Sequence, residues 1–194
     1  MNQQRFLSGF SSVKLGHLQP FIQNLMLLMT GMPGVGKTTI ITKVAEQLRN
    51  KRIGGFYTRE IRKSRERSGF LLETFGGLQQ TIAHIDFPHV HQVGKYGVDI
   101  AGIDAAVASA LAPDADVDLY LVDEIGKMEC LSASFIAAME KLFDCGKPLV
   151  ATISKKGSGF IEQVKRRPDA LLWEVTHANR DKLPQQVLHW LSTQ

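Results

Sequence analysis

Residues 31–38 of the sequence read GMPGVGKT, and this stretch decides the expected fold. It matches the pattern G-x-x-x-x-G-K-[S/T] at every specified position, with an apolar segment before it at 25–30 and helical apolar spacing after it over 37–50. The glycines allow a tight backbone turn in which successive N–H groups point at a phosphate, and the start of the following helix favours negative charge. The stretch therefore predicts a phosphate-binding loop between a buried strand and a helix.

The residues of this loop have distinct expected tasks. The Lys37 side chain is expected to reach the β- and γ-phosphates of a nucleotide, which makes it a candidate catalytic residue, and the Thr38 hydroxyl is expected to ligate Mg²⁺. A glycine-rich turn before a helix can be purely structural, but here both flanking segments also fit. The predicted nucleotide contacts in this segment are Gly31, Met32, Pro33, Gly34, Val35, Gly36, Lys37, Thr38 and Thr39.

Two consecutive carboxylates, Asp123 and Glu124, follow a second apolar run at 119–122. A phosphate-binding loop needs an acid at the end of a neighbouring strand to hold Mg²⁺, and Asp123 has that position. Asp123 is therefore predicted to bind the metal together with Thr38. The predicted nucleotide contacts around this strand end are Leu121, Val122, Asp123, Glu124, Ile125 and Gly126.

Glu124 is open to three interpretations. It could be a general base that orients or deprotonates a water for attack on the γ-phosphate. Alternatively, 123–126 could be the D-x-x-G element of a GTPase switch, with Gly126 sensing the γ-phosphate; no N-K-x-D guanine motif accompanies it. In the third interpretation Glu124 merely caps the following turn. Tandem acids at a strand end beside a phosphate loop favour the first interpretation, so Glu124 is the predicted catalytic base.

The rest of the chain alternates between segments with strand-like patterns and segments with helical spacing of apolar residues. Strands are expected over 56–61, 69–74, 80–85, 119–122, 148–153 and 171–175, and helices over 101–112, 132–144, 159–166 and 181–191. Such alternation predicts an α/β fold, in which right-handed crossovers build a mostly parallel sheet with helices on both faces. The segment 69–85 breaks the alternation, because Gly76 and Gly77 predict the turn of an inserted β-hairpin.

Composition supports one globular domain. The chain has 194 residues, of which 44% are hydrophobic and 22% are charged, as in globular proteins. We divide it into an N-terminal extension, 1–24, which is expected to have no fixed structure, and a single nucleotide-binding domain, 25–194. No apolar run approaches the roughly 18 residues of a membrane span, so no membrane association is expected. Cytoplasmic localisation is the expectation, although the extension, which lacks Asp and Glu, leaves an organelle transit peptide open.

Partner expectations follow from charge and from two further segments. The net charge of +4 suits anionic ligands such as nucleoside triphosphates, but it gives little support for nucleic-acid binding. A basic run, Arg59 to Arg67, is expected to be a solvated hairpin face or loop, from which one arginine could approach the γ-phosphate. Asn179 and Arg180 follow a late strand and are candidate contacts to the nucleotide base. The oligomeric state is open, with a monomer slightly favoured.

Four stretches give the sequence a family resemblance. They are TGMPGVGKTT at 30–39, GGFYTREIR at 54–62, SGF at 68–70 and LVDEIGKME at 121–129, with a weaker likeness in VTHANRDKLP at 175–184. On these stretches, residues 26–192 resemble the cancer-related, or THEP-type, nucleoside triphosphatases. The phosphate loop alone is generic, whereas GGFYTREIR together with DEIGKME is specific.

The resemblance implies a RecA-like P-loop fold and Mg²⁺-dependent hydrolysis of ATP, GTP, CTP and UTP to the diphosphate and phosphate, with little base selectivity. By position, it assigns phosphate and metal binding to Lys37 and Thr38, the metal to Asp123 and the attacking water to Glu124. Other residues of these stretches match without a defined role: Glu60, Arg62, Lys127 and Glu129. Two alternatives remain, a small-molecule or nucleotide kinase and a nucleotide-gated nucleic-acid-binding module.

Overall fold

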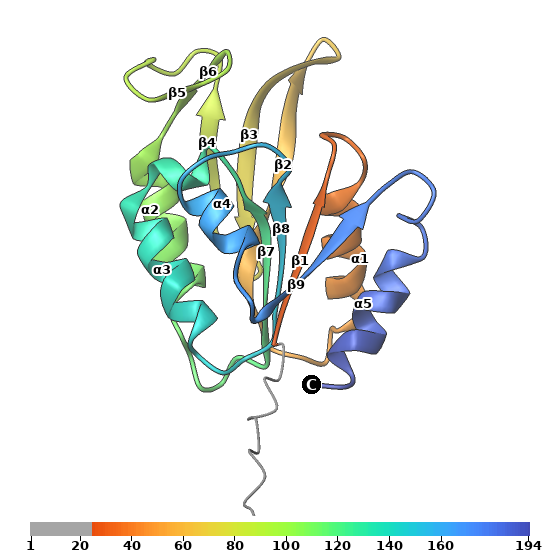
Figure 1. Ribbon diagram of the computed structural model, residues 1–194. Helices are drawn as coiled ribbons and strands as arrows, with labels where there is room; N and C mark the ends of the chain where they lie inside the picture. The colour runs from red at the N-terminus through yellow and green to blue at the C-terminus, as the bar shows by residue number, and fades with distance from the viewer. Residues whose placement is uncertain (1–24) are drawn as a thin grey trace, which may run out of the picture.

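The structure, a computed structural model, describes residues 25–194; the predicted extension, 1–24, lies outside them. The described chain forms a nine-stranded sheet in the order β5-β6-β4-β3-β2-β7-β8-β1-β9 (Figure 1). The strands are β1 Met26–Gly31, β2 Ile53–Lys63, β3 Glu66–Thr74, β4 Gln79–His84, β5 Gln92–Val93, β6 Tyr96–Val98, β7 Leu119–Ile125, β8 Leu149–Ser154 and β9 Ala170–Val175.

Helices cover both faces of this sheet, which confirms the predicted α/β fold (Figure 1). On one face, α1 and α5 pack with the sheet into one hydrophobic core, which includes Ile41, Val187 and Trp190. On the other face, α2, α3 and α4 contribute to a second core, which includes Phe135 and Ile161. The helices are α1 Lys37–Gln47, α2 Ile100–Ala110, α3 Ala133–Phe143, α4 Phe160–Lys165 and α5 Leu183–Leu191, with a 3₁₀ turn, η1, at Glu129–Leu131.

The strands β7, β8, β1 and β9 pair in parallel, and the first residues of β2 join them through β7. The middle residues of β1, β7 and β8 are continuously buried, as expected for parallel strands that have helices on both faces. The carboxyl ends of these strands therefore meet at one edge of the sheet, where α/β proteins bind their ligands.

The antiparallel part of the sheet is larger than the single hairpin predicted at 69–85. Strand β2 pairs with β7 only over 53–56 and then continues antiparallel to β3 as far as Lys63. The basic run forms the end of this hairpin, where Ser64 and Arg65 turn the chain at positive φ angles of 50° and 69°. We call residues 57–74 the arm. Strands were predicted over 56–61 and 69–74, but their charged ends at 62–63 and 66–68 were not, because both faces of the sheet are solvated there.

Strands β5 and β6 were not predicted either, and their shortness explains why. They contain two and three residues, too few for a visible alternation of apolar and polar positions. The predicted hairpin turn at Gly76 and Gly77 is confirmed between β3 and β4, with Gly77 at a φ of 93°. Ser132 caps α3 as its side chain accepts a hydrogen bond from the Phe135 N–H at 2.9 Å.

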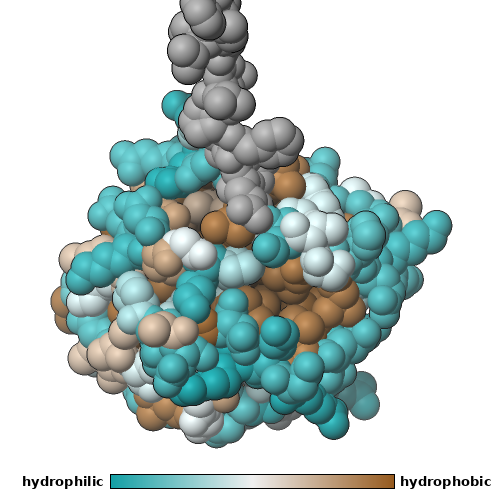
Figure 2. Space-filling model, turned by 90° about the horizontal axis from the view of Figure 1, so that it is seen from below, coloured by the Kyte–Doolittle hydropathy of each residue, from teal (hydrophilic) through white to brown (hydrophobic). Residues whose placement is uncertain are grey.

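The two ends of the sheet differ in shape. Figure 2 shows the end at which β1 begins, where hydrophobic residues are interspersed with polar ones. A hollow of about 90 Å³ lies where β1 and β8 begin, lined by Leu25, Met26, Phe143, Gly146, Lys147, Leu149 and Asp169. The much larger cleft at the opposite end is the candidate site. None of the helices in residues 25–194 combines the length and apolar character needed to cross a bilayer.

Candidate active site

A cleft of about 790 Å³ opens where β1, β7 and β8 end. Its wall includes ten of the predicted nucleotide contacts: Gly31, Met32, Pro33, Gly34, Gly36, Lys37, Thr38, Thr39, Asp123 and Glu124. Other predicted contacts lie behind this wall, and four of them are buried in the hydrophobic core: Val35, Leu121, Val122 and Ile125. Two stretches that are 84 residues or more apart in sequence thus meet at one surface.

The phosphate loop has the conformation that its glycines predict. Gly34 and Gly36 have φ angles of 76° and 110°, a region that side-chain-bearing residues rarely adopt. Between them, Val35 is 3% exposed and anchors the loop in the core. Helix α1 begins at Lys37, so its free N–H groups and its positive dipole end point at the loop. The loop therefore provides a site for an anion without further rearrangement of its backbone.

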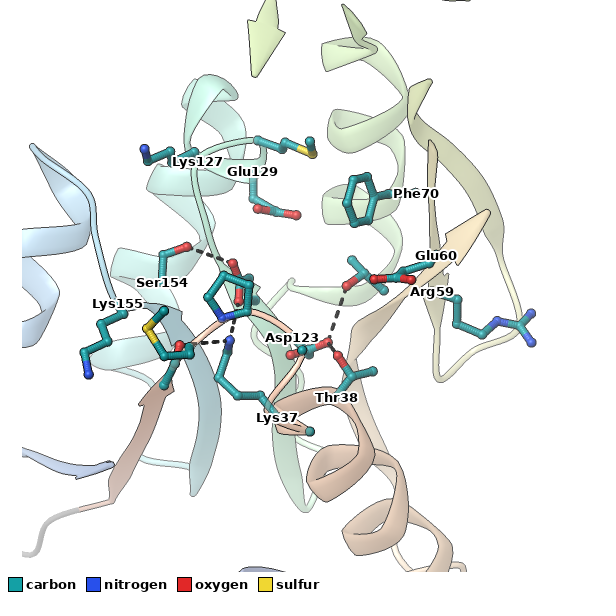
Figure 3. A pocket seen from close by; sticks show the side chains of 18 of the residues that line it. Lys37, Thr38, Arg59, Glu60, Phe70, Asp123, Lys127, Glu129, Ser154 and Lys155 are labelled. Atoms are coloured by element: carbon teal, nitrogen blue, oxygen red, sulfur yellow. Dashed lines mark hydrogen bonds and ion pairs between the residues drawn. The ribbon is translucent and has the colours of Figure 1, made fainter. Parts of the chain in front are cut away.

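Lys37 connects this loop to the second acid (Figure 3). Its Nζ lies 3.5 Å from Glu124 Oε2 and donates a hydrogen bond to the Gly31 carbonyl at 3.4 Å, and its side chain is only 10% exposed. The other carboxylate oxygen of Glu124 accepts a hydrogen bond from Ser154 Oγ at 2.8 Å. Glu124 is thus held in a fixed orientation by one cation and one hydroxyl.

Asp123 is surrounded by hydroxyl groups and is only 2% exposed. Thr38 Oγ1 donates to one carboxylate oxygen at 2.6 Å, and Thr152 Oγ1 donates to the other at 2.5 Å. Thr58 Oγ1 lies 3.4 Å from the first oxygen. Burial raises the pKa of Asp123, and these hydrogen bonds oppose the rise only in part. A carboxylate beside a threonine hydroxyl is a hard oxygen donor set, which fits Mg²⁺.

An irregularity in β7 explains how two consecutive acids reach one cleft. Successive side chains of a regular strand point to opposite faces of the sheet. The register between β7 and β8 shifts between Val122 and Ile125, at the position of the two acids. This shift allows both Asp123 and Glu124 to line the cleft.

A third carboxylate, Glu129, lies beside Glu124, although no role was predicted for it from the sequence. A Cβ added to Gly126 would meet Glu129 Oε2 at 2.6 Å and Glu124 Oε1 at 2.9 Å, so the two acids are neighbours across this glycine. Glu129 is 4% exposed, and burial followed by the charge of Glu124 raises its pKa to about 8. It is therefore largely protonated at neutral pH. The only signal in the sequence was the match of 121–129 to the family pattern.

The arm forms the far wall of the cleft, with contributions from Thr58, Glu60, Arg67 and Phe70. Thr58 and Glu60 are two residues apart on β2, so they point to the same face, and Glu60 pairs with Phe70 across the hairpin. The sequence suggested an arginine near the γ-phosphate, but it did not indicate that an acid and an aromatic ring of the same hairpin share the cleft.

Asn179 and Arg180, the candidate base contacts, lie in the turn after β9. The Asn179 side chain is engaged with backbone: its Oδ1 accepts from the Thr176 N–H and its Nδ2 donates to the Glu174 carbonyl, both at 2.8 Å. Arg180 lies against the phosphate loop, where its Nη1 donates to the Val35 carbonyl at 3.4 Å. Neither residue lines the cleft, so this turn supports the loop from its outer side.

Comparison with solved structures gives two close matches in fold. The crystal structure of THEP1 from the hyperthermophile Aquifex aeolicus matches with a TM-score of 0.78 and 33% sequence identity, covering 86% of this chain and 98% of that one. The solution structure of a human cancer-related nucleoside triphosphatase matches with a TM-score of 0.74 and 30% identity, covering 87% of this chain and 97% of that one.

Sequence relatives agree with these structures. The nucleoside-triphosphatase THEP1 of Thermotoga maritima is 41% identical over 165 residues, which is 84% of this chain and 94% of that protein. The protein of the same name from Methanocaldococcus jannaschii is 34% identical over 171 residues, or 85% and 96% of the two chains. The family model described as NTPase matches residues 26–188. The chain therefore belongs to the NTPase family.

Proposed function

We propose that residues 25–194 form the catalytic domain of a Mg²⁺-dependent nucleoside triphosphatase, which hydrolyses ATP, GTP, CTP and UTP to the diphosphate and phosphate. The observation that carries this proposal is the position of Glu124. It lines the same cleft as the phosphate loop and is held by Lys37 and Ser154. The names of the relatives, nucleoside-triphosphatase THEP1, support the same activity.

Thr38 and Asp123 are the residues that would hold Mg²⁺. Their oxygens lie 2.6 Å apart, and Asp123 is kept in place by Thr152 from the opposite side. Bound Mg²⁺ supplies neutralisation of the charge on the β- and γ-phosphates. Asp123 would have to be ionised to bind this metal, because a metal ligand must be deprotonated.

The chain's own residues would then act on the water and on the phosphates. Glu124 accepts a proton from the water whose oxygen attacks the γ-phosphorus, and the bond from that phosphorus to the β–γ bridging oxygen breaks. The Lys37 ammonium and the N–H groups of the loop stabilise the negative charge on the phosphate oxygens. Since Lys37 already contacts Glu124 and the loop, one cation joins the base to the phosphate site.

Low base selectivity is part of the proposal, because the turn after β9 presents no free side-chain amide to a base within the described residues. The Asn179 amide, which could distinguish bases by hydrogen bonding, already bonds two backbone groups. Selectivity of several orders of magnitude requires polar groups that are left unpaired by the wrong base. We therefore expect similar rates for the four triphosphates.

The test is the substitution Glu124→Gln. It removes the base but keeps the size and hydrogen-bonding capacity of the side chain, so nucleotide binding should persist while phosphate release falls by about 10²- to 10⁴-fold. Phosphate release is measured for ATP, GTP, CTP and UTP, each with Mg²⁺ and with EDTA, and binding is measured separately by titration. The matched control is Glu129→Gln, which changes the neighbouring acid. Wild-type release by Glu124→Gln would show that Glu124 is not the base.

A phosphotransferase is the second candidate, and one observation favours it. The cleft continues past the catalytic acids to Phe70, Val93 and Met128, which could accommodate a second organic substrate. In a kinase, an acceptor hydroxyl would replace the water. A kinase would convert ATP to ADP with a phosphorylated product and little free phosphate, so the ratio of free phosphate to ADP distinguishes the two activities.

A further inference from the structure

We propose that Arg67 is the cation that neutralises the γ-phosphate during hydrolysis, and that Glu60 holds it ready on the wall of the cleft. This inference rests on the proposed triphosphatase activity, and it identifies one arginine among the basic residues of the arm. Three observations support it: the place of the arm above the phosphate site, the partners of each basic residue, and the unsatisfied nitrogen of Arg67.

The arm extends beyond the carboxyl end of β7. The last parallel partners are Phe56 and Val122, directly before the two catalytic acids. Thr58 lies two residues further and approaches Asp123, and Glu60 lies two residues further again on the same face of β2. The Glu60 side chain therefore lies on the cleft wall beyond Asp123, across from Lys37 (Figure 3).

The basic residues of the arm differ in their partners. Arg59 also lines the cleft, but it forms an ion pair with Glu73 at 2.5 Å, and its side chain points away from Lys37 and Asp123 (Figure 3). Arg62 pairs with Glu60 but does not line the cleft, and Lys63 is exposed at the end of β2. Arg67 also pairs with Glu60, and its side chain does line the cleft.

Arg67 is positioned from two sides and has a free donor. Its guanidinium pairs with Glu60 through Nη2 and lies 5.4 Å from the centre of the Phe70 ring. Its Nε is buried and has no hydrogen-bond partner within the described part of the chain. Buried N–H groups normally have an acceptor, and a shift of the Arg67 side chain toward the cleft would let this nitrogen donate to a phosphate oxygen. A guanidinium can donate to phosphate through two parallel N–H groups.

Glu60 provides an exchange of partners. Burial raises the pKa of Glu60, but the hydrogen bonds from Arg67 and Arg62 lower it by more than burial raises it. The net shift of the pKa is downward, so Glu60 is ionised at neutral pH. The γ-phosphate of a bound nucleotide would compete with this carboxylate for Arg67. Because Arg62 remains paired with Glu60, the acid keeps a cation when Arg67 turns to the phosphate. The two ion pairs of Glu60 therefore hold Arg67 in place but allow it to exchange Glu60 for a phosphate.

The test compares Arg67→Ala with Lys63→Ala, a change of another basic residue on the same hairpin. Arg67→Ala should lower kcat by about 10²- to 10³-fold while KM changes only a few-fold, because a cation that acts on the transition state contributes little to ground-state binding. Arg67→Lys should restore part of the loss. Lys63→Ala should keep wild-type kcat.

A second readout separates this role from a structural one. ADP with aluminium fluoride imitates the transferring phosphoryl group, so wild-type protein should bind it more tightly than ADP in the presence of Mg²⁺. Arg67→Ala should keep its affinity for ADP and lose most of that preference. Unchanged kcat in Arg67→Ala, or an equal loss of affinity for both ligands, would overturn the assignment of Arg67. Failure of the wild-type protein to release phosphate would instead overturn the proposed function.

Discussion

The parallel strands β7, β8 and β1 differ from the arm in what surrounds their residues. The parallel strands are buried along almost their whole length, and polar groups emerge only at their carboxyl ends. The outer part of the arm is solvated and carries alternating acids and arginines joined in ion pairs. Both regions contribute to one cleft, with the phosphate loop and the two acids on one side and Glu60 and Arg67 on the other.

This difference separates a rigid region of the cleft from a region whose ion pairs can exchange partners. A buried strand cannot move without opening a cavity or leaving a buried polar group without a hydrogen bond. The phosphate site on the parallel strands is therefore rigid. The ion pairs of the arm are partly exposed, and such pairs contribute little to stability and can exchange partners. In our proposals, the rigid region positions the nucleotide and water, while the arm supplies a charge that responds to the γ-phosphate.

The largest effect should come from the core at the point where the two regions meet. Phe56 is fully buried and pairs with both Val122 of β7 and Thr74 of β3. Phe56→Ala should lower the free energy of unfolding by about 3–5 kcal/mol, from lost burial and a residual cavity. Urea unfolding measures the change. The control, Lys63→Ala at the exposed end of the same strand, should stay within about 0.5 kcal/mol of wild type, and equal losses would contradict the separation.

A smaller effect, confined to function, is expected at the phosphate loop. Lys37→Ala removes a charge that contacts Glu124 and is expected to contact phosphate, so kcat should fall by about 10²- to 10³-fold and nucleotide binding should weaken. Steady-state phosphate release and nucleotide titration measure the two parameters. Lys43→Ala is the matched control, because Lys43 lies on the exposed side of the same helix. A Lys37→Ala protein with wild-type affinity and rate would show that the loop does not bind the triphosphate.

The remaining expected effect is in the pH dependence of stability. The pKa of Glu129 is raised from 4.5 to about 8 in the folded chain, so the folded state binds a proton that the unfolded state releases. The resulting contribution is fully present below about pH 4.5 and is lost as the pH rises through about 8. The melting temperature should therefore decline over this window.

The matched variant for this prediction is Glu129→Gln, which resembles the protonated acid but cannot ionise. Its melting temperature should decline less than that of wild type across the same window. Each loss of about 1 kcal/mol in the free energy of unfolding lowers the melting temperature by about 2–4 °C for a domain of this size. Identical pH profiles for the two proteins would mean that the surroundings of Glu129 do not raise its pKa.

Local sequence patterns were sufficient for the parallel part of the fold. The apolar runs of β1, β7 and β8 and the helical spacing of α1 are strong signals, because burial on both faces requires continuous apolar residues. The phosphate loop could also be read directly, since its glycines meet a backbone requirement that is local. The last helix, α5, begins at Leu183 rather than at 181, a difference within the ordinary uncertainty of a helix end.

The outer end of the arm, the surroundings of Glu129 and the small strands β5 and β6 could not be derived in this way. Charged residues on a solvated hairpin have no apolar alternation, so the length of β2 and its change of partner follow only from pairing with β7 and β3. Nothing local shows that Glu129 is buried beside Glu124, because its burial depends on how the chain turns after Gly126.

The sequence by itself determined the nucleotide-binding class of this protein, its α/β fold and the identity of the loop and of the two adjacent acids, because these depend on short stretches whose chemistry is local. Only the tertiary structure decided which groups face one another across the cleft. Glu60, Arg67 and Phe70 join Lys37 and Glu124 there because a strand that begins in the parallel sheet ends in an antiparallel hairpin. Such contacts between distant segments arise from strand pairing and burial, which short sequence motifs do not specify.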